Sequence, residues 1–444
     1  MAAATAATIG FVPVRKSPLL AWALWDCGAT GLNALVITFV FPVYLTASVG
    51  AGGGTSPTSS LGRAMTVAGV IVALCAPMTG SWITDPRRRR HVLTALTLAV
   101  VVLTATMSLI RDDPRYLLTG LILLAATAAC GDLASVPYNA TLRLISTPET
   151  SGRISGFGLA SGYVGSVALL LTVYVGFIAG GGSTAGALGI STADGLNVRM
   201  AMLLTAAWFL FFALPLLIWA PKPPAMARDQ VAAAVGAVRQ LWADFVAEWR
   251  RDRNVVYYLL ASAVFRDGLS GVFAFGAVLG VNVYRISAAN VLLFGVMACT
   301  VAAVGAVLGG LLDQRVGSKA VILGSLASMI AVGLTLLTLS GPLAFWVCGL
   351  LLCLFIGPTQ SSARALLLQM TADGKEGLAF GLYTTTGRAA AFLAPSMFFT
   401  FIDLFGADRA GLGGLLVVLT AGLLAMLPIR ARPVAPMSPA WLAD

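Results

Sequence analysis

Apolar stretches of about 20 residues recur along almost the whole chain, and they constrain the fold more than any other feature. A helix of that length crosses the ~30 Å hydrocarbon core of a bilayer. Of the 444 residues, 58% are hydrophobic and only 10% are charged, and the mean hydropathy is +0.90. Soluble domains carry about 25% charged residues, and the short alternating segments of a membrane β-barrel are not seen. The sequence therefore predicts an all-α integral membrane protein.

Twelve transmembrane helices are expected, in two pseudo-symmetric six-helix bundles. The expected spans are residues 19–46, 63–83, 92–110, 116–145, 155–179, 199–220, 256–283, 289–312, 320–339, 343–370, 378–402 and 411–429. They divide the chain into an N-terminal segment (1–18), an N-terminal bundle (19–220), a central loop (221–255), a C-terminal bundle (256–429) and a tail (430–444). Apolar residues recur at helical spacing in the central loop, which predicts an amphipathic helix on the membrane surface.

The loop charges predict the orientation in the membrane. Nineteen lysines and arginines fall on the side of the two termini and six on the other. Because cytoplasmic loops carry the excess of these residues, we expect both termini in the cytoplasm. The net charge of +10 is then mainly a topology signal, and no nucleic-acid module is expected. The preference for arginine over lysine suggests a GC-rich bacterial gene, and hence a bacterial plasma membrane.

Residue types also exclude several classes of site. The six cysteines fall inside apolar runs without CxxC spacing, so they are interpreted as buried hydrophobic residues. With one histidine and three glutamates, none clearly at mid-membrane, a membrane enzyme lacks its nucleophile, base or metal cluster. We expect no enzyme activity, metal or cofactor. The expected partners are the bilayer, a small-molecule substrate and protons, and the expected state is a monomer.

The two halves of the chain have similar features at corresponding positions. Asp26 lies early in span one and Asp267 early in span seven, and glycines follow each of them. The loop "SWITDPRRRRHVL" after span two corresponds to "GGLLDQRVGSKAVIL" after span eight, since each has an aspartate followed by a basic turn. Two homologous six-helix bundles around a central path are the plan of many secondary transporters.

These two loops resemble the signature loop of the major facilitator superfamily. The second is the better match, through Gly309, Asp313, Arg315, Gly317 and Lys319. The first departs from the pattern, because Asp85 is followed by a proline and four arginines.

Four longer stretches are similar to the autophagy-type vacuolar effluxer branch of that superfamily. They are "WALWDCGATGLNALVITFVFPVYL", "GDLASVPYNATLRLISTPETSGRISGFGLASGYVGS", "FRDGLSGVFAFGAVLG" and "GPTQSSARALLLQMTADGKEGLAFGLYTTTGRAAAFLAPSMF". The resemblance implies a proton-linked or facilitative carrier of small solutes, and amino-acid efflux is the activity associated with the fungal members.

The deepest charges are the first candidates for the substrate and proton pathway. Asp267 lies ~16 Å into span seven and Arg388 ~15 Å into span eleven, counted at 1.5 Å per residue; Asp132 is in the middle of span four. With Arg266, they would converge if spans one, four, seven and ten line the path, as the superfamily plan implies.

Each of these charges has two open interpretations. Asp267 is either a proton-coupling carboxylate or one half of a permanent ion pair, with Arg266 or across helices. Adjacent helical residues do not face each other, so we expect Arg266 to point elsewhere. Asp132 is a second proton candidate. Arg388 either contacts substrate or pairs two helices.

Candidate gating residues lie nearer the cytoplasm. Arg364 is expected to form a gate or helix–helix ion pair with Asp26, which lies at comparable depth across the bundle. Asp26 is therefore a gating partner first and a substrate ligand second. Asp85 and Asp313, with the adjacent Arg315, are assigned to conformational control at the cytoplasmic helix ends. Their expected neighbours are Arg153 and the start of the helix of Arg388; the alternative is that these loops only set topology.

Four uncharged polar residues within spans are candidates to bind substrate, or else to join helices: Tyr138, Asn139, Gln360 and Tyr383. Together these features predict a secondary active transporter that moves a small polar, amino acid-like solute by alternating access, with proton-coupled efflux. A proton-coupled exporter of drugs or organic cations, and a non-transporting sensor or scaffold, remain alternatives.

Overall fold

A computed structural model describes residues 16–50, 57–83, 86–180, 183–219, 253–286, 288–372 and 374–430. The amphipathic helix expected in the central loop lies outside the described residues, as do Asp85, the N-terminal segment up to residue 15 and the tail beyond residue 430.

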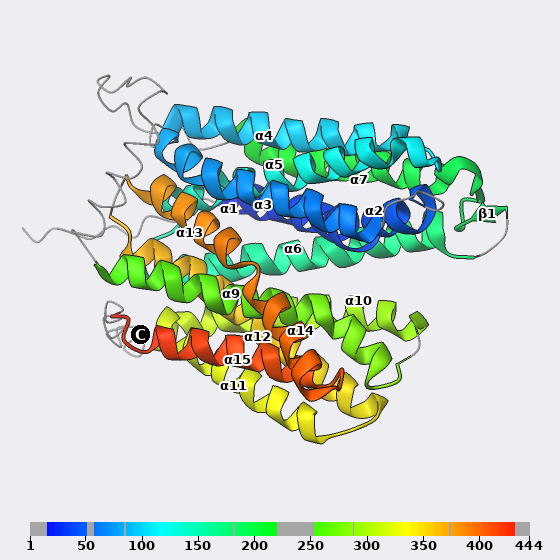
Figure 1. Ribbon diagram of the computed structural model, residues 1–444. Helices are drawn as coiled ribbons and strands as arrows, with labels where there is room; N and C mark the ends of the chain where they lie inside the picture. Colours follow the sequence, from blue (N-terminus) through cyan, green and yellow to red (C-terminus); the bar gives the residue numbers. More distant parts are fainter. Residues whose placement is uncertain are drawn as a thin grey trace, which may run out of the picture.

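In the described residues, the N-terminal half contains six helical segments long and apolar enough to cross a membrane, and Figure 1 shows them lying side by side. In chain order its elements are α1 (Lys16–Leu32), the π-helical η1 (Asn33–Phe39), α2 (Phe41–Val43), the π-helical η2 (Tyr44–Val49), α3 (Pro57–Trp82), α4 (Pro86–Thr106), η3 (Met107–Leu109), η4 (Pro114–Tyr116), α5 (Leu117–Ile145), α6 (Ser151–Val173), η5 (Tyr174–Ile178), β1 (Thr184–Ala185), β2 (Ile190–Ser191), η6 (Ala193–Gly195) and α7 (Leu196–Trp219). Strands β1 and β2 pair antiparallel, with Thr184 opposite Ser191, in the loop before α7.

The C-terminal half repeats this plan. Its elements are α9 (Arg253–Asn282), α10 (Ala288–Val316), α11 (Ser318–Thr338), α12 (Pro342–Met370), α13 (Glu376–Ala390), α14 (Leu393–Phe405) and α15 (Ala410–Met426). Helices α13 and α14 together make one span, Glu376–Phe405, which is broken near its middle.

The predicted all-α fold of twelve spans is confirmed. Among the described residues, eleven helical segments are long and apolar enough to cross a membrane, and the 17-residue apolar helix Ala410–Met426 makes the twelfth. The ends differ from the predicted ones by a few residues, because the helices continue past their apolar parts into polar turns. Between α10 and α11 a single residue, Gly317, makes the turn at φ 86°. Only glycine adopts that conformation readily.

Equivalent contacts show the pseudo-symmetry of the halves. Across one interface, Gly152 and Gly156 of α6 face Gly310 and Ala306 of α10; across the other, Gly377 and Gly381 of α13 face Gly80 and Ala76 of α3. Within each half, a tyrosine near the end of the first span donates to a carbonyl near the end of the third: Tyr44 to Ile110 (3.1 Å) and Tyr284 to Leu336 (2.7 Å). Burial raises the pKa of the Tyr284 phenol, which keeps it protonated as a donor.

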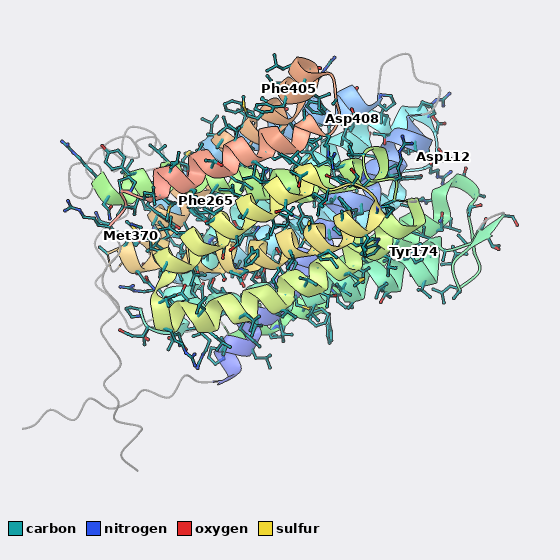
Figure 2. All side chains as sticks on the ribbon, turned by 90° about the horizontal axis from the view of Figure 1, so that it is seen from below. Asp112, Tyr174, Phe265, Met370, Phe405 and Asp408 are labelled. Atoms are coloured by element: carbon teal, nitrogen blue, oxygen red, sulfur yellow. The ribbon has the colours of Figure 1, made fainter. Side chains whose placement is uncertain are left out.

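The halves meet mainly at one end of the molecule. The side where α1 begins and α15 ends is called the terminal side here, and the opposite one the distal side. Figure 2 shows Met370 at the terminal side and Asp112 and Asp408 at the distal side. The hydrogen bonds and ion pairs described between the halves lie between the terminal side and the membrane midplane. The structure is therefore closed on the terminal side.

Candidate functional site

A charged cluster at the midplane joins the two halves. Asp132, near the middle of α5, is in direct ionic contact with Arg388 of α13. Their side chains keep 23% and 35% exposure, so this pair is not sealed inside the protein. Arg266 of α9 lies within electrostatic reach of Asp132. Of the four charges that were expected to converge, Asp132, Arg266 and Arg388 therefore lie together in the structure.

Arg266 is held by an aromatic ring instead of a carboxylate. Its guanidinium lies 3.6 Å from the centre of the Tyr383 ring and donates to the Tyr383 carbonyl at 2.9 Å. A cation over an aromatic face is attracted by about 0.5–2 kcal/mol, but the charge is not neutralised. As predicted, Arg266 points away from Asp267.

Asp267 does not join this cluster. Its Oδ2 accepts a 2.5 Å hydrogen bond from the backbone N–H of Ala394, in the first turn of α14. The helix breaks between α13 and α14, before Pro395, because proline has no N–H and its ring blocks the preceding turn. Asp267 caps the helix end exposed by that break. Among the described residues it forms neither the ion pair with Arg266 nor one with another helix.

Removing the Asp267 carboxylate is expected to lower the stability of the protein through loss of the helix cap, because this carboxylate forms no ion pair with a described residue. Asp267→Ala leaves the first N–H groups of α14 unpaired in the membrane, so we expect a loss of about 0.5–2 kcal/mol in the free energy of unfolding. Asp267→Asn keeps an acceptor oxygen and should stay close to wild type. Thermal melting of both variants in detergent checks this; equal losses in the two would contradict the capping role.

Asp26 and Arg364 form the ion pair that was predicted between spans one and ten. Arg364 Nη1 lies 3.7 Å from Asp26 Oδ2. The same guanidinium donates to Asn139 Oδ1 at 3.4 Å and to the Ser155 carbonyl at 3.3 Å. Thr30 Oγ1 donates to the other Asp26 oxygen at 3.1 Å. Arg364 belongs to the C-terminal half and all its partners here belong to the N-terminal half.

An aromatic stack borders this pair. The ring of Tyr138 stacks on Trp22, with centroids 4.7 Å apart, and on Trp25, with centroids 4.2 Å apart. Trp22 also donates to the Tyr138 carbonyl at 3.1 Å. The phenol oxygen of Tyr138 is buried and lies close enough to Asp26 and Arg364 to interact with both, although it forms no well-aligned hydrogen bond with a described residue. Tyr138 is therefore positioned by packing, with its polar end aimed at the ion pair.

A second ionic contact on the terminal side was not anticipated from the sequence. Glu376, the first residue of α13, lies 3.8 Å from Arg143 of α5 and 3.9 Å from Arg89 of α4. Arg89 also donates to the Ala140 carbonyl at 3.1 Å, and Arg143 to the Leu368 carbonyl at 3.3 Å. We call Glu376, Arg89 and Arg143 the terminal clasp. The sequence feature that could have indicated this contact is a glutamate at the start of a membrane span.

The other predicted gating residues divide into two groups. Asp313 is buried against Gly152 at the start of α6 in the other half, and its Oδ1 accepts from Ser318 at 2.9 Å. Its expected position at a neighbouring helix end is therefore observed. Arg153 and Arg315 are exposed, and neither has an ion pair with a described residue.

Gln360, a predicted substrate contact, is half-buried and has no hydrogen bond to the described part of the chain. Near it, Gln369 of the same helix bridges the halves by donating to Ser151 Oγ at 3.2 Å and to the Pro148 carbonyl at 3.1 Å. Sequence inspection selected Gln360 for its place within the span, but tertiary packing gave the inter-half contact to Gln369.

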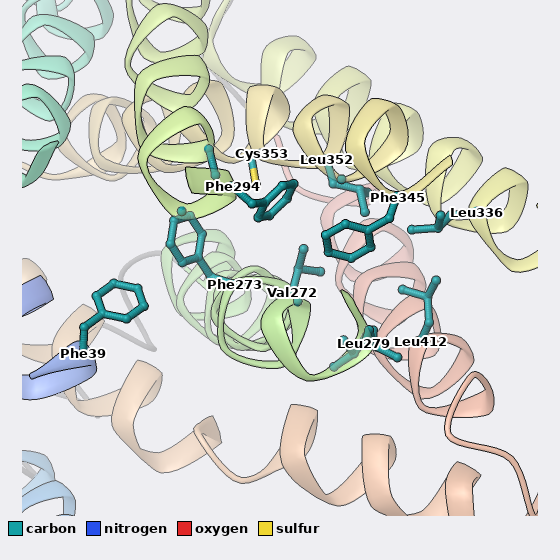
Figure 3. Close-up of a pocket in the computed structure, with 15 residues that line it drawn as sticks. Phe39, Val272, Phe273, Leu279, Phe294, Leu336, Phe345, Leu352, Cys353 and Leu412 are labelled. Atoms are coloured by element: carbon teal, nitrogen blue, oxygen red, sulfur yellow. The ribbon is translucent and has the colours of Figure 1, made fainter. Parts of the chain in front are cut away.

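An apolar cavity of about 70 Å³ lies in the distal part of the C-terminal half (Figure 3). Residues of α9, α10, α12 and α15 line it, among them Phe273, Phe294 and Phe345, and Phe39 lies across from them in the N-terminal half. No charged side chain lines the cavity. Nor do the described residues contain a group of three or more potential metal ligands. The charged side chains that join the halves lie elsewhere, around Asp132, around Asp26 and in the terminal clasp.

Sequence comparison places the chain among membrane carriers. The model of the family described as "Vacuole effluxer Atg22 like" matches residues 48–433. YxiO of Bacillus subtilis, named as an uncharacterised MFS-type transporter, is 21% identical over 418 residues, which cover 92% of this chain and 94% of that protein. Autophagy-related protein 22 of Yarrowia lipolytica is 23% identical over 284 residues, which cover 57% of this chain and 46% of that protein. The match thus spans about half the length of the fungal relative.

Comparison with solved structures supports the same fold. The fucose:proton symporter FucP of E. coli superposes with a TM-score of 0.68 at 14% identity, covering 94% of this chain and 98% of that one. At that identity the likeness shows the fold alone. With two six-helix halves, inter-half ion pairs and a family match over most of its length, the chain belongs to the Atg22-like vacuole effluxer family of major facilitator transporters, and it is not an enzyme.

Proposed function

We propose that this transporter exports a small zwitterionic, amino acid-like solute by alternating access, in exchange for protons. In this proposal it works as a monomer in a bacterial plasma membrane, with its terminal side in the cytoplasm. The family description as an effluxer supports the direction. The loop charges support the orientation.

One observation carries the choice of substrate, namely the separation of charge between the halves. In the two clusters the carboxylates, Asp26 and Asp132, come from the N-terminal half, and the guanidinium groups, Arg266, Arg364 and Arg388, come from the C-terminal half. A zwitterion also carries a positive and a negative group that are separated in space, so its charges can match those of the two halves. Its ammonium group suits the N-terminal half, and its carboxylate suits Arg266 or Arg388.

This arrangement also gives a reason for coupling between binding and movement. When the halves move apart around the site, the ion pairs between them must separate. Separation leaves each charge without its partner, at a cost that solvent reduces for the partly exposed Asp132–Arg388 pair. A zwitterion between Asp132 and Arg388 supplies both opposite charges and lowers that cost. An empty carrier lacks this compensation.

The same charges disfavour organic cations. Three arginines against two aspartates leave an excess positive charge, and Arg266 has an aromatic ring but no carboxylate in direct contact. Two like charges about 4 Å apart repel by ~4 kcal/mol at an effective dielectric constant of 20. A substrate with a carboxylate meets attraction at this point.

Flux in proteoliposomes tests the proposal. Vesicles preloaded with a mixed pool of labelled amino acids should release label faster when a pH gradient is imposed, and unlabelled amino acids should compete. Tetraphenylphosphonium, a cation without a carboxylate, should neither compete nor be carried. Gradient-driven movement of tetraphenylphosphonium without amino-acid flux would support a cation exporter instead. Binding of amino acids without flux would support a sensor.

A further inference from the structure

We infer that Asp26 is the residue that couples proton movement to opening of the terminal side, through its ion pair with Arg364. The inference rests on the proposed proton-coupled transport and names the group that carries the proton. The sequence alone favoured Asp267 for this role, with Asp132 as the second candidate.

Asp26 Oδ2 and the Tyr138 phenol oxygen are buried next to Arg364, and neither forms a well-aligned hydrogen bond with a described residue. Asp26 is 7% exposed, and its Oδ2 lies 3.7 Å from Arg364 Nη1. A buried polar atom without a partner costs about 1–3 kcal/mol. The Tyr138 phenol can donate its own proton to the ionised Asp26 Oδ2, or accept from that oxygen when it is protonated. Because a buried carboxylate charge without well-aligned hydrogen bonds is costly, a proton on Asp26 relieves the cost of the buried charge.

Arg364 is the cation that faces Asp26 among the described residues. Arg364 reaches Asp26 from α12, while α5 and α6, which pack against α1, contribute the phenols of Tyr138 and Tyr163. Helix α7 packs on α1 through Phe209 and Phe212 at Gly28. Protonation of Asp26 thus removes the attraction to a single, identifiable guanidinium.

Loss of that attraction weakens a contact between the halves. Arg364 would then be held only by Asn139 Oδ1 at 3.4 Å and the Ser155 carbonyl at 3.3 Å, both long for N–H···O hydrogen bonds. A proton taken up from the distal side therefore favours the state open to the terminal side. There Asp26 releases the proton and can again attract Arg364. The proton moves from distal to terminal while substrate moves the opposite way.

The other two candidate proton-coupling carboxylates, Asp132 and Asp267, have different contacts from those of Asp26. Asp132 touches Arg388 directly and lies near Arg266, so protonation would forfeit attraction to two cations at once. Asp267 accepts a backbone hydrogen bond from Ala394 in its own half, so its protonation would release no contact between the halves.

Asp313 is the remaining rival. It too has a buried Oδ2 without a hydrogen bond, and its Oδ1 accepts from Ser318 in its own half. No ion pair joins it to a cation of the described residues, so its protonation would free no guanidinium. Asp26 alone among these carboxylates combines an unpartnered oxygen with a cation from the opposite half.

Matched substitutions separate these carboxylates. In proteoliposomes with labelled amino acids, exchange by Asp26→Asn should no longer vary with pH, whatever its absolute rate, because the amide mimics the protonated acid at every pH. Stimulation of this exchange by a pH gradient should fall to about onefold. Asp267→Asn should keep the wild-type stimulation. Size-exclusion profiles and melting curves verify that both variants fold.

Tyr138→Phe provides an independent test. It keeps the ring between Trp22 and Trp25 but removes the phenol that can donate to the ionised Asp26, so the ionised form is destabilised. The pH midpoint of exchange should move to higher pH. An unchanged midpoint would contradict the role of the phenol.

The outcomes are distinguishable. Gradient stimulation that survives in Asp26→Asn, or is lost in Asp267→Asn or Asp313→Asn instead, overturns the inference while leaving transport intact. If the wild-type protein carries no amino acid, the proposed function itself fails. Tryptophan emission, which should change with pH in the wild type and not in Asp26→Asn because Trp22 and Trp25 contact Tyr138, then tests proton binding at Asp26 without flux.

Discussion

Glu376→Gln is expected to destabilise the protein by about 3 kcal/mol or more and to open its terminal side. The carboxylate is 5% exposed and lies within 4 Å of Arg89 and Arg143. Neutralising it leaves two partly buried guanidinium groups without their common counter-charge, and breaking a buried pair in this way costs about 3–5 kcal/mol. The clasp joins α13 of one half to α4 and α5 of the other, so its loss favours separation of the halves there.

Two measurements check this expectation. The melting temperature should fall, and a cysteine introduced by Ser155→Cys, buried between the halves on the terminal side, should react with a maleimide at least ~10-fold faster, since 1.4 kcal/mol is tenfold in an equilibrium. Glu149→Gln is the matched control, because that glutamate is exposed on the same side. Equal effects of the two substitutions would show that Glu376 has no special role in closing the molecule.

Exchanging the charges of Asp132 and Arg388 is expected to show that transport requires more than the stability that this ion pair gives. Either single reversal, Asp132→Arg or Arg388→Asp, places like charges in contact at the midplane, where two such charges repel by ~4 kcal/mol at an effective dielectric constant of 20. Flux should therefore fall at least ~100-fold. The double exchange restores an ion pair and should recover the melting temperature. It also reverses the polarity between the halves, so amino-acid flux should stay low.

Recovery of flux in the double exchange would mean that this pair only links α5 to α13. The substrate carboxylate would then have to depend on Arg266 alone. Asp408→Arg, a reversal at an exposed residue on the distal side, should leave flux within about twofold of wild type and controls for a change in net charge.

Local features of the sequence were enough to predict the number and approximate positions of the membrane spans. Apolar length and loop charge predicted the spans, because a helix in lipid must satisfy its backbone within the segment. Helical geometry also predicted that Arg266 would turn away from Asp267, since neighbouring residues lie on different faces. Equal depth of Asp26 and Arg364 anticipated the pair that the structure shows at 3.7 Å.

The partners of the remaining charges depended on contacts between distant segments. Asp267 caps a helix end that exists only because the eleventh span breaks before Pro395, and the sequence does not show which neighbour faces that break. The terminal clasp likewise combines residues from α4, α5 and α13. Depth along each helix is set by the sequence at 1.5 Å per residue. Which faces meet is decided by side-chain packing between helices, and that packing, here through close glycine contacts between the halves, exists only in the tertiary structure.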